Sequence, residues 1–355
     1  MAKSVSDKIK VGISIGDVNG VGMEVIIKTF IDARMINLCT PIVYGSGKIA
    51  GYHRKAIGVN DFSFNQIKDA SEANPKKANL VNCWDELVEI KLGEATAVAG
   101  EYAIKSLEYA VKDLAAGKID VLVTAPFNKK TIQSSEFDFP GHTEYLQSYS
   151  NAESSLMFMV AGSLRVGVAT GHVPLKDVSA NLTKELIVEK LQLMESSLIR
   201  DFGIAKPKIA VLGLNPHAGD NGLLGAEEQE IIAPAVKKMR EEGVLAYGPY
   251  ASDGFFGSSA LGEFDGVLAM YHDQGLAPFK ALSFENGVNF TAGLPVVRTS
   301  PDHGTGYDIA GKNVASEQSF RQAVYLAIDI YRNRQLHKEI NSNPLPVKKG
   351  GKKDS

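Results

Sequence analysis

Two patterns of apolar and polar positions, one typical of strands and one typical of helices, follow each other in turn along this chain. Short apolar runs bounded by Gly, Pro or Asn are typical of buried strands, and longer stretches with apolar residues three or four apart are typical of amphipathic helices. The short runs predict strands over residues 10–16, 40–46, 119–126, 156–162, 164–171, 208–216, 265–271, 287–293 and 295–300. The longer stretches predict helices over residues 22–36, 96–118, 183–203, 225–243 and 317–340.

This alternation predicts the α/β class, with a mainly parallel sheet covered by helices. The sequence shows no fixed-period repeat and no Pro/Gly/Ser-rich linker. We place one passage between two domains near Asn128 and the return near Arg298. The domains are then residues 1–128 plus 299–342 and residues 129–298, and the Lys-rich residues 343–355 form a disordered tail.

The composition is that of an ordinary globular protein, because 44% of the 355 residues are hydrophobic and 22% are charged. No apolar stretch approaches the ~20 residues that span a bilayer, and the N-terminus lacks the apolar segment of a signal peptide. The two cysteines, Cys39 and Cys83, have no spacing typical of a disulfide framework or a thiolate zinc site. We therefore expect a cytoplasmic protein without a membrane partner. The net charge of −3 also argues against nucleic acid as a partner.

Three histidines share one context, since His172, His217 and His272 each follow a predicted strand. In an open α/β sheet, ligands bind in the crevice beyond the carboxyl ends of the strands. Three imidazoles at that edge could hold one divalent metal and leave a coordination position for substrate. A lone loop histidine is more often unrelated to a ligand, but three in the same context favour a metal site.

The segment GHTEY adds His142 and Thr143 to the candidate site residues. An imidazole and a hydroxyl are both suited to hydrogen-bonding a phosphate or a carboxylate. The same segment could equally be a helix start, with Thr143 as the N-cap and His142 merely exposed. The residues alone leave both interpretations open.

Three further polar residues, Lys280, Asn289 and Arg298, follow the last of the three histidines. Together they could hold a doubly anionic substrate, with Arg298 as a bidentate fork and Lys280 as a point charge. A lysine beside a divalent cation has its ammonium form disfavoured, so Lys280 could also accept a proton. Asp273 and Asp253 could orient the imidazoles or a metal-bound oxygen, or they could be ordinary loop carboxylates.

Two Gly-rich segments follow strands. Residues 300–312 let the backbone approach a flat or phosphorylated ligand closely. Residues 16–24, GDVNGVGME, could cradle a phosphate at a helix N-terminus or form a tight turn for packing, and packing is the favoured interpretation. Neither segment matches GxGxxG or the Walker A pattern, so neither a Rossmann site nor a P-loop is predicted.

Five motifs in order resemble those of the 4-hydroxythreonine-4-phosphate dehydrogenase family: GHTEYL, TGHVPLKDV, NPHAGDNGLLGAEE, YHDQGLAPFK and TSPDHGTGYDIAGK. The last motif also resembles the cofactor loop of isopropylmalate and isocitrate dehydrogenases. The resemblance implies two α/β/α domains of that type with a cleft between them, and not a Rossmann fold. It also implies NAD or NADP as cofactor, positioned by a loop with Gly304, Thr305, Asp308 and Lys312.

The resemblance assigns roles to the candidate residues. It implies that His172, His217 and His272 bind one divalent metal, which would be zinc, magnesium or cobalt. It implies a homodimer whose active site is completed across the subunit interface, and NAD(P)-dependent oxidation of 4-phosphooxy-L-threonine in pyridoxal phosphate biosynthesis. We expect Lys280, or a water held by Asp273, to accept the proton, with Asp253 as a supporting catalytic residue. The implied substrate-binding residues are His142, Thr143, Lys280, Asn289 and Arg298.

Two segments depart from the family pattern and bear on the shape of the pocket. The first loop reads GDVNGVGME where the family is closer to GDPAGIGPE, and ASDGFFG stands where PADTLF is usual. A related dehydrogenase acting on erythronate or threonate 4-phosphate therefore remains an alternative. A metallohydrolase would have no need of the Gly-rich loop. A non-catalytic phosphoacid-binding protein would have no need of the complete histidine set and Lys280.

Overall fold

The structure is a computed structural model that describes residues 8–133, 137, 139, 141–283 and 285–343. Of the predicted tail, residues 344–355 lie outside the described residues. The strands are β1 (Ile9–Ser14), β2 (Cys39–Gly45), β3 (Asn65–Ile67), β4 (Asn79–Asn82), β5 (Val121–Thr124), β6 (Leu156–Ala161), β7 (Leu164–Val168), β8 (Lys208–Leu212), β9 (Leu245–Tyr250), β10 (Gly266–Ala269), β11 (Val288–Ala292) and β12 (Arg298–Pro301). The α-helices are α1 (Gly22–Ile31), α2 (Ala33–Leu38), α3 (Gly47–Ala56), α4 (Ala97–Ala115), α5 (His142–Tyr149), α6 (Val178–Asn181), α7 (Lys184–Arg200), α8 (Ala233–Glu241), α9 (Ser252–Phe256), α10 (His272–Ser283) and α11 (Gln318–Asn341).

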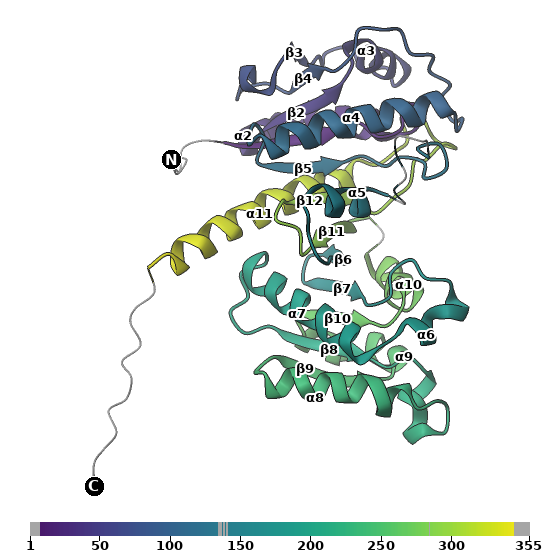
Figure 1. Cartoon of the computed structure of the whole chain (residues 1–355). Coiled ribbons are helices and arrows are strands. Elements are labelled where there is room, and N and C mark those ends of the chain that lie inside the picture. The colour runs from purple at the N-terminus through teal and green to yellow at the C-terminus, as the bar shows by residue number, and fades with distance from the viewer. Residues whose placement is uncertain (1–7, 134–136, 138, 140, 284, 344–355) are drawn as a thin grey trace.

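A 12-stranded sheet runs the length of the molecule in the order β3-β4-β2-β1-β5-β12-β11-β6-β7-β10-β8-β9 (Figure 1). Most neighbours are parallel, but the β12–β11, β11–β6 and β6–β7 pairs at the centre are antiparallel. The predicted α/β class with a mainly parallel sheet is confirmed. A tight turn joins β6 to β7, since Ala161 pairs with Leu164 across Gly162 and Ser163.

The chain passes from one half of the sheet to the other after β5 and returns at β12. β1–β5 and β12 therefore form one half, and β6–β11 form the other. The pairing of β11 with β12 makes the sheet continuous between the two halves. The division into two domains near Asn128 and Arg298 stays a prediction.

Helix α4 illustrates how local sequence sets the bounds of an element. The Thr96 hydroxyl caps its start by accepting the Ala99 N–H at 3.2 Å. Small and apolar residues three or four apart, such as Ala103, Leu107 and Ala110, are buried on one face and pack over the sheet. Gly117 then adopts a φ of +68°, which lets the chain leave the helix toward β5.

Other boundaries differ from prediction for local reasons. The predicted helix over residues 22–36 is interrupted at Asp32, which is extended and accepts the Arg34 N–H, so that α1 and α2 are separate helices. The strands β3, β4 and β9 were not predicted, and β4 has only four residues. β3 has only three residues, and β9 contains Gly248 and Pro249, residues that usually argue against a strand.

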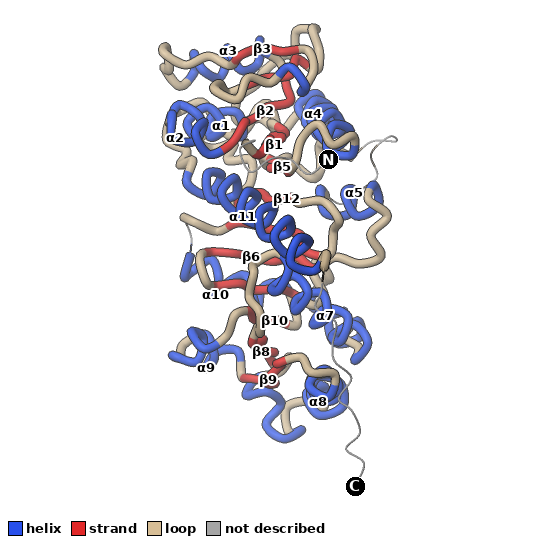
Figure 2. The backbone as a smooth tube through the Cα atoms, turned by 90° about the vertical axis from the view of Figure 1, so that its left-hand side faces the viewer, coloured by secondary structure: helices blue, strands red, loops and turns tan. Residues whose placement is uncertain are grey.

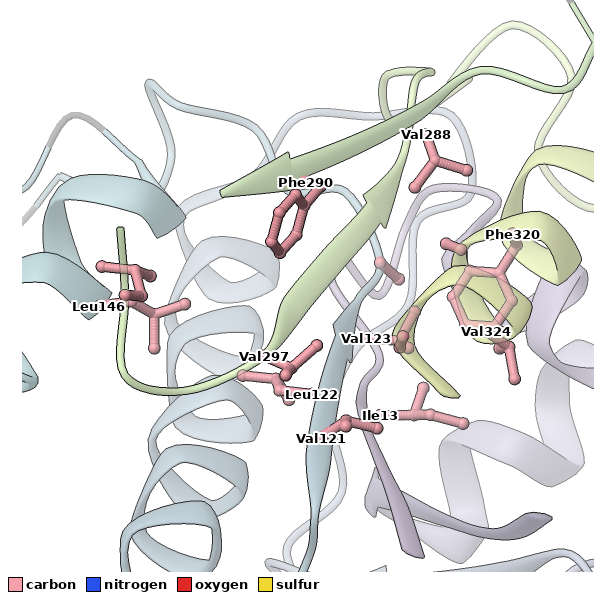
Figure 3. Close-up of a cluster of buried hydrophobic side chains, with 14 of the residues drawn as sticks. Ile13, Val121, Leu122, Val123, Leu146, Val288, Phe290, Val297, Phe320 and Val324 are labelled. Carbon is pink, nitrogen blue, oxygen red and sulfur yellow. The ribbon is translucent and has the colours of Figure 1, made fainter. Parts of the chain in front are cut away.

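The core around the centre of the sheet joins elements of both halves (Figure 3). Val123 of β5 and Val324 of α11 belong to the first half, whereas Leu146 of α5 and Phe290 of β11 belong to the second. Each of the four side chains is at most 1% exposed. This shared core fixes β5, β11 and β12 relative to α5, and these are the elements that carry the site.

Helix α11 crosses the centre of the sheet on one face (Figure 2). Its Arg334 donates to the carboxylate of Asp201 at 2.7 Å, and Arg200 at the end of α7 donates to the same carboxylate at 2.8 Å. Asp201 is fully buried. Burial raises its pKa, but the two guanidinium groups outweigh burial and hold the pKa below its ordinary value. This ion-pair network ties α11 to α7.

Candidate active site

A cavity of about 300 Å³ lies at the centre of the sheet, where β5, β11 and β12 meet the starts of α5 and α10. It brings together all five predicted substrate residues and two of the three predicted metal ligands. These are His142, Thr143, Lys280, Asn289, Arg298, His172 and His272. Residues more than 150 positions apart in the sequence thus line one space.

Arg298 begins β12 and is only 4% exposed. Its Nε and Nη2 donate to the Thr124 hydroxyl at 3.1 and 2.7 Å, and its Nη1 donates to the Asn289 side-chain oxygen at 3.4 Å and to the Thr291 hydroxyl at 3.5 Å. Burial lowers its pKa to about 10. All of its hydrogen-bond partners among the described residues are neutral. A buried guanidinium on neutral partners is an attractive site for an oxyanion.

His142 is the first residue of α5, and its ring stacks on Phe127 with centroids 3.7 Å apart. Its Nε2 is buried and has no hydrogen-bond partner among the described residues. Burial, with Arg298 and Lys129 nearby, holds its pKa well below the ordinary value. The interpretation of Thr143 as N-cap is wrong, because Gly141 occupies that position and makes no side-chain cap. The Thr143 hydroxyl instead lies 3.4 Å from that of Thr291.

His172 and His272 lie side by side, with ring centroids 5.5 Å apart. His272 begins α10, and its Nδ1 is 2.6 Å from the Asp273 carboxylate. The Nδ1 of His172 is 3.9 Å from the carboxylate of Glu144. Burial and Lys129 lower the pKa of His172, while Glu144 opposes them. Both rings therefore have a carboxylate nearby, as metal-binding histidines commonly do.

His217 does not join this pair in the single chain. It lines a neighbouring, more open cavity with Asp253 and Asp273, the two acidic residues predicted to take part in catalysis. Among the described residues, no group of three or more His, Cys, Asp or Glu side chains is arranged to hold a metal. Asp273 lies between the two sites, because it contacts the His272 ring and also lines this second cavity.

The loop that carries His217 has an unusual backbone. Residues 217–221 are five successive residues with φ between 42° and 81°, and Gly219 is the only glycine among them. Non-glycine residues in this region are strained, and such strain commonly marks functional sites. The buried Glu228 fixes the start of the loop, because its carboxylate accepts the N–H groups of Leu214 and Asn215, both at 2.7 Å.

Lys280 contacts a residue that sequence reasoning missed. Its ammonium lies 3.1 Å from the Asp302 carboxylate, whose side chain is 17% exposed. Burial raises the pKa of Asp302, and the Lys280 ammonium opposes this effect. Thr124, Lys129, Glu144 and His303 line the same cavity and were also missed. Thr124 carried a usable signal, since it lies near the carboxyl end of the predicted strand over residues 119–126.

The Gly-rich segment 304–312 leaves the cavity at Gly304. The first loop of the chain holds it in place, since Val21 N–H donates to the Thr305 carbonyl at 2.9 Å and the Tyr307 hydroxyl donates to Asp17 at 2.7 Å. Burial raises the pKa of Asp17 and raises that of Tyr307 to about 12. The N–H groups of Asp17, Asn19, Gly20 and Val21 thus have acceptors within the chain, and the choice of packing over a phosphate cradle for residues 16–24 stays a prediction. Of the remaining predicted cofactor residues, the Lys312 ammonium donates to the Asp308 carbonyl at 2.7 Å.

A sequence model of one protein family, described as pyridoxal phosphate biosynthetic protein PdxA, matches residues 37–327. A 4-hydroxythreonine-4-phosphate dehydrogenase from Bacteroides thetaiotaomicron is 57% identical over 340 residues, which are 96% of this chain and 93% of that protein. A D-threonate 4-phosphate dehydrogenase from Cupriavidus necator is 39% identical over 328 residues, which are 91% of this chain and 98% of that protein. The crystal structure of a 4-hydroxythreonine-4-phosphate dehydrogenase from Klebsiella pneumoniae superposes with a TM-score of 0.79 at 34% identity, covering 93% of this chain and 99% of that one.

No helix in the described part of the chain is long and apolar enough to cross a membrane.

Proposed function

The chain belongs to the family of the pyridoxal phosphate biosynthetic protein PdxA, and from this premise we propose that it is a metal- and NAD(P)-dependent 4-hydroxythreonine-4-phosphate dehydrogenase. It oxidises 4-phosphooxy-L-threonine to 2-amino-3-oxo-4-phosphooxybutanoate, which loses carbon dioxide to give 3-amino-2-oxopropyl phosphate. One observation carries the proposal. The buried cation of Arg298 and the imidazoles of His172 and His272 face one cavity, so an anionic group and a reacting hydroxyl can be held together.

The donor set fits a divalent metal ion such as zinc, magnesium or cobalt. The contact of His272 Nδ1 with Asp273 leaves Nε2 of the same ring available, which is the usual arrangement of a carboxylate-supported metal ligand. A divalent cation bound there supplies Lewis acidity that lowers the pKa of a substrate hydroxyl. The protein's part is to present His172 and His272 at the cavity wall with their ring orientations set by neighbouring carboxylates.

We propose that His217 of the partner subunit in a homodimer provides the third imidazole. In the single chain, His217 faces a separate cavity. The segments after His172 and His217 both expose apolar side chains, with Leu175 73% and Leu223 78% exposed. The Ser179 hydroxyl donates to Glu227 at 2.7 Å and so joins these two segments. A second subunit that covered these side chains would bury their apolar surface and would complete the site.

The remaining groups divide the work of binding and proton transfer. Arg298, Asn289, His142 and Thr143 bind the anionic groups of the substrate, and their binding energy holds the reacting carbon in place. Lys280 accepts the hydroxyl proton, and a water held by Asp273 is the alternative acceptor. Lys280 lies 3.1 Å from the Asp302 carboxylate, which holds its side chain at the wall of the cavity.

NAD or NADP would supply the hydride acceptor, and the segment from Gly304 to Lys312 would hold its nicotinamide. Gly304 lines the cavity, which places the start of this segment beside the substrate site. The product is a β-keto acid, which decarboxylates readily because its carbonyl takes up the electron pair.

A second candidate substrate is D-threonate 4-phosphate, since two relatives at 39% identity carry that substrate in their names. The two substrates share the phosphate, hydroxyl and carboxylate groups. 4-Phosphooxy-L-threonine carries an amino group where D-threonate 4-phosphate carries a hydroxyl group. The test is reduction of NAD and of NADP by the purified protein with each substrate in turn, with and without a chelator. The proposal expects faster turnover of 4-phosphooxy-L-threonine and loss of turnover in chelator. Undiminished turnover in chelator contradicts the metal assignment, and turnover of D-threonate 4-phosphate alone replaces the first substrate with the second.

A further inference from the structure

The first observation concerns Thr124, the last residue of β5, which is fully buried. Its hydroxyl accepts two of the hydrogen bonds of Arg298, from Nε at 3.1 Å and from Nη2 at 2.7 Å. These are the two shortest contacts that the guanidinium makes, since its bonds to Asn289 and Thr291 measure 3.4 and 3.5 Å. The hydroxyl therefore fixes one edge of the planar guanidinium.

The second observation is the strand geometry that brings the two residues together. β5 and β12 are parallel neighbours in the sheet, with Arg298 paired to Leu122 and Thr299 to Val123. Both residues lie in the wall of the cavity. A guanidinium binds an oxyanion best as a two-pronged fork, which requires its plane to be fixed. Thr124 holds the guanidinium edge formed by Nε and Nη2, and Nη1 makes only the two longer contacts, to Asn289 and Thr291.

We propose that Thr124 is a positioning residue that aims the buried Arg298 guanidinium at an oxyanion of the substrate. The inference rests on the proposed function only in taking this cavity as the substrate site. The burial that lowers the pKa of Arg298 also makes an incoming anion a strong stabiliser of its charge. Thr124 itself carries no charge and acts through the orientation of the guanidinium.

The alternative role of Thr124 is structural, as one of several buried hydroxyls that satisfy the interior. Thr299 is the matched example, because it is the next residue after Arg298, is fully buried and donates to the Ala323 carbonyl at 2.8 Å. Thr299→Val removes a buried hydroxyl of the same kind without touching Arg298. A structural role would make the two valine variants alike in ligand binding.

The experiment measures the binding of inorganic phosphate to the full-length protein by calorimetry, which requires no turnover. Thr124→Val is expected to weaken phosphate binding about tenfold or more, since a hydrogen bond to a charged group is worth about that much in an equilibrium constant. Thr124→Ser, which keeps the hydroxyl, and Thr299→Val are expected to bind phosphate as the wild type does. With the phosphorylated substrate, Thr124→Val is expected to raise KM by a similar factor with little change in kcat.

Two results would overturn the proposal. One is a folded Thr124→Val protein that binds phosphate as tightly as the wild type, and the other is a wild type with no saturable phosphate binding. If Thr124→Val does not fold, Arg298→Lys decides, because lysine keeps the charge but cannot form the fork. Arg298→Lys is expected to bind phosphate about tenfold more weakly, and unchanged binding refutes the positioning role. If the wild type oxidises neither substrate, the proposed function is wrong. The phosphate-binding measurements still test the role of Thr124 in that case.

Discussion

The separation of His217 from the pair of His172 and His272 leads to a sharp prediction about mixed dimers. If each site takes His172 and His272 from one subunit and His217 from the other, the variants His172→Ala and His217→Ala are each inactive but complement one another. In a mixed dimer, the subunit with intact His172 faces the subunit with intact His217, so that one of the two sites is whole. The other site lacks both imidazoles.

The size of the effect follows from counting sites. Random reassortment of equal amounts of the two variants makes about half of all dimers mixed, and each mixed dimer has one whole site of two, so about a quarter of wild-type activity should return. Each variant alone should be slower than the wild type by roughly 10³-fold or more, because a catalytic metal contributes several kcal/mol to transition-state stabilisation. The recovered activity therefore stands far above the background.

The assay is the rate of NAD(P) reduction before and after the two variants are unfolded together and refolded. The control mixes His172→Ala with His272→Ala, whose histidines belong to the same half of the site, and this mixture should stay inactive. Recovery in the control, or no recovery in the test mixture while the refolded wild type is active, would refute the shared site.

Three further predictions concern residues with defined contacts. Arg298→Ala should raise KM for the phosphorylated substrate much more than KM for NAD(P), and steady-state kinetics showing the reverse would place Arg298 at the cofactor. Asp201→Asn should lower the free energy of unfolding at neutral pH by up to about 3 kcal/mol, because it removes the buried carboxylate that pairs with Arg334 and Arg200, whose side chains are 11% and 32% exposed. The pKa of Asp201 is lower in the folded chain than in the unfolded chain. The stabilisation by this carboxylate is therefore fully present above the unfolded pKa of about 4 and is lost as the pH falls below that value. Urea unfolding curves that show the same difference between wild type and variant at pH 3 as at neutral pH would contradict this prediction. Tyr307→Phe should raise KM for NAD(P) several-fold with little effect on substrate KM, because the Gly-rich segment loses its bond to Asp17, and an unchanged cofactor KM would show that this bond does not position the segment.

The sequence predicted which residues line the cavity better than it predicted the contacts among them. His172 and His272 could be found because each directly follows a predicted strand, and strand ends at one edge of a sheet meet in space. His142 and Arg298 were found instead from their side-chain chemistry. The role of Thr124 could not be found in this way, because it depends on β5 pairing with β12, which lies 174 residues away in the sequence. Which strands become neighbours is set by packing of the whole chain.

The position of His217 shows a different limit. Its motif resembles those of the other two histidines in the sequence, but residues 217–221 turn through left-handed backbone and carry its side chain into the neighbouring cavity. Residues other than glycine seldom adopt this conformation, so no local pattern indicated it. The pairing of Lys280 with Asp302 was missed for a similar reason, since α10 and the end of β12 meet only in the folded chain.

The most direct test is an anomalous-scattering crystal structure of the protein grown with zinc and inorganic phosphate. The expected result is one zinc ion per cavity, bound by His172 and His272 of one subunit and His217 of the other, with phosphate on Arg298 of the same cavity. Zinc bound away from these imidazoles, or a dimer that leaves His217 remote from both, would contradict the assignment of this cavity as a metal-dependent active site.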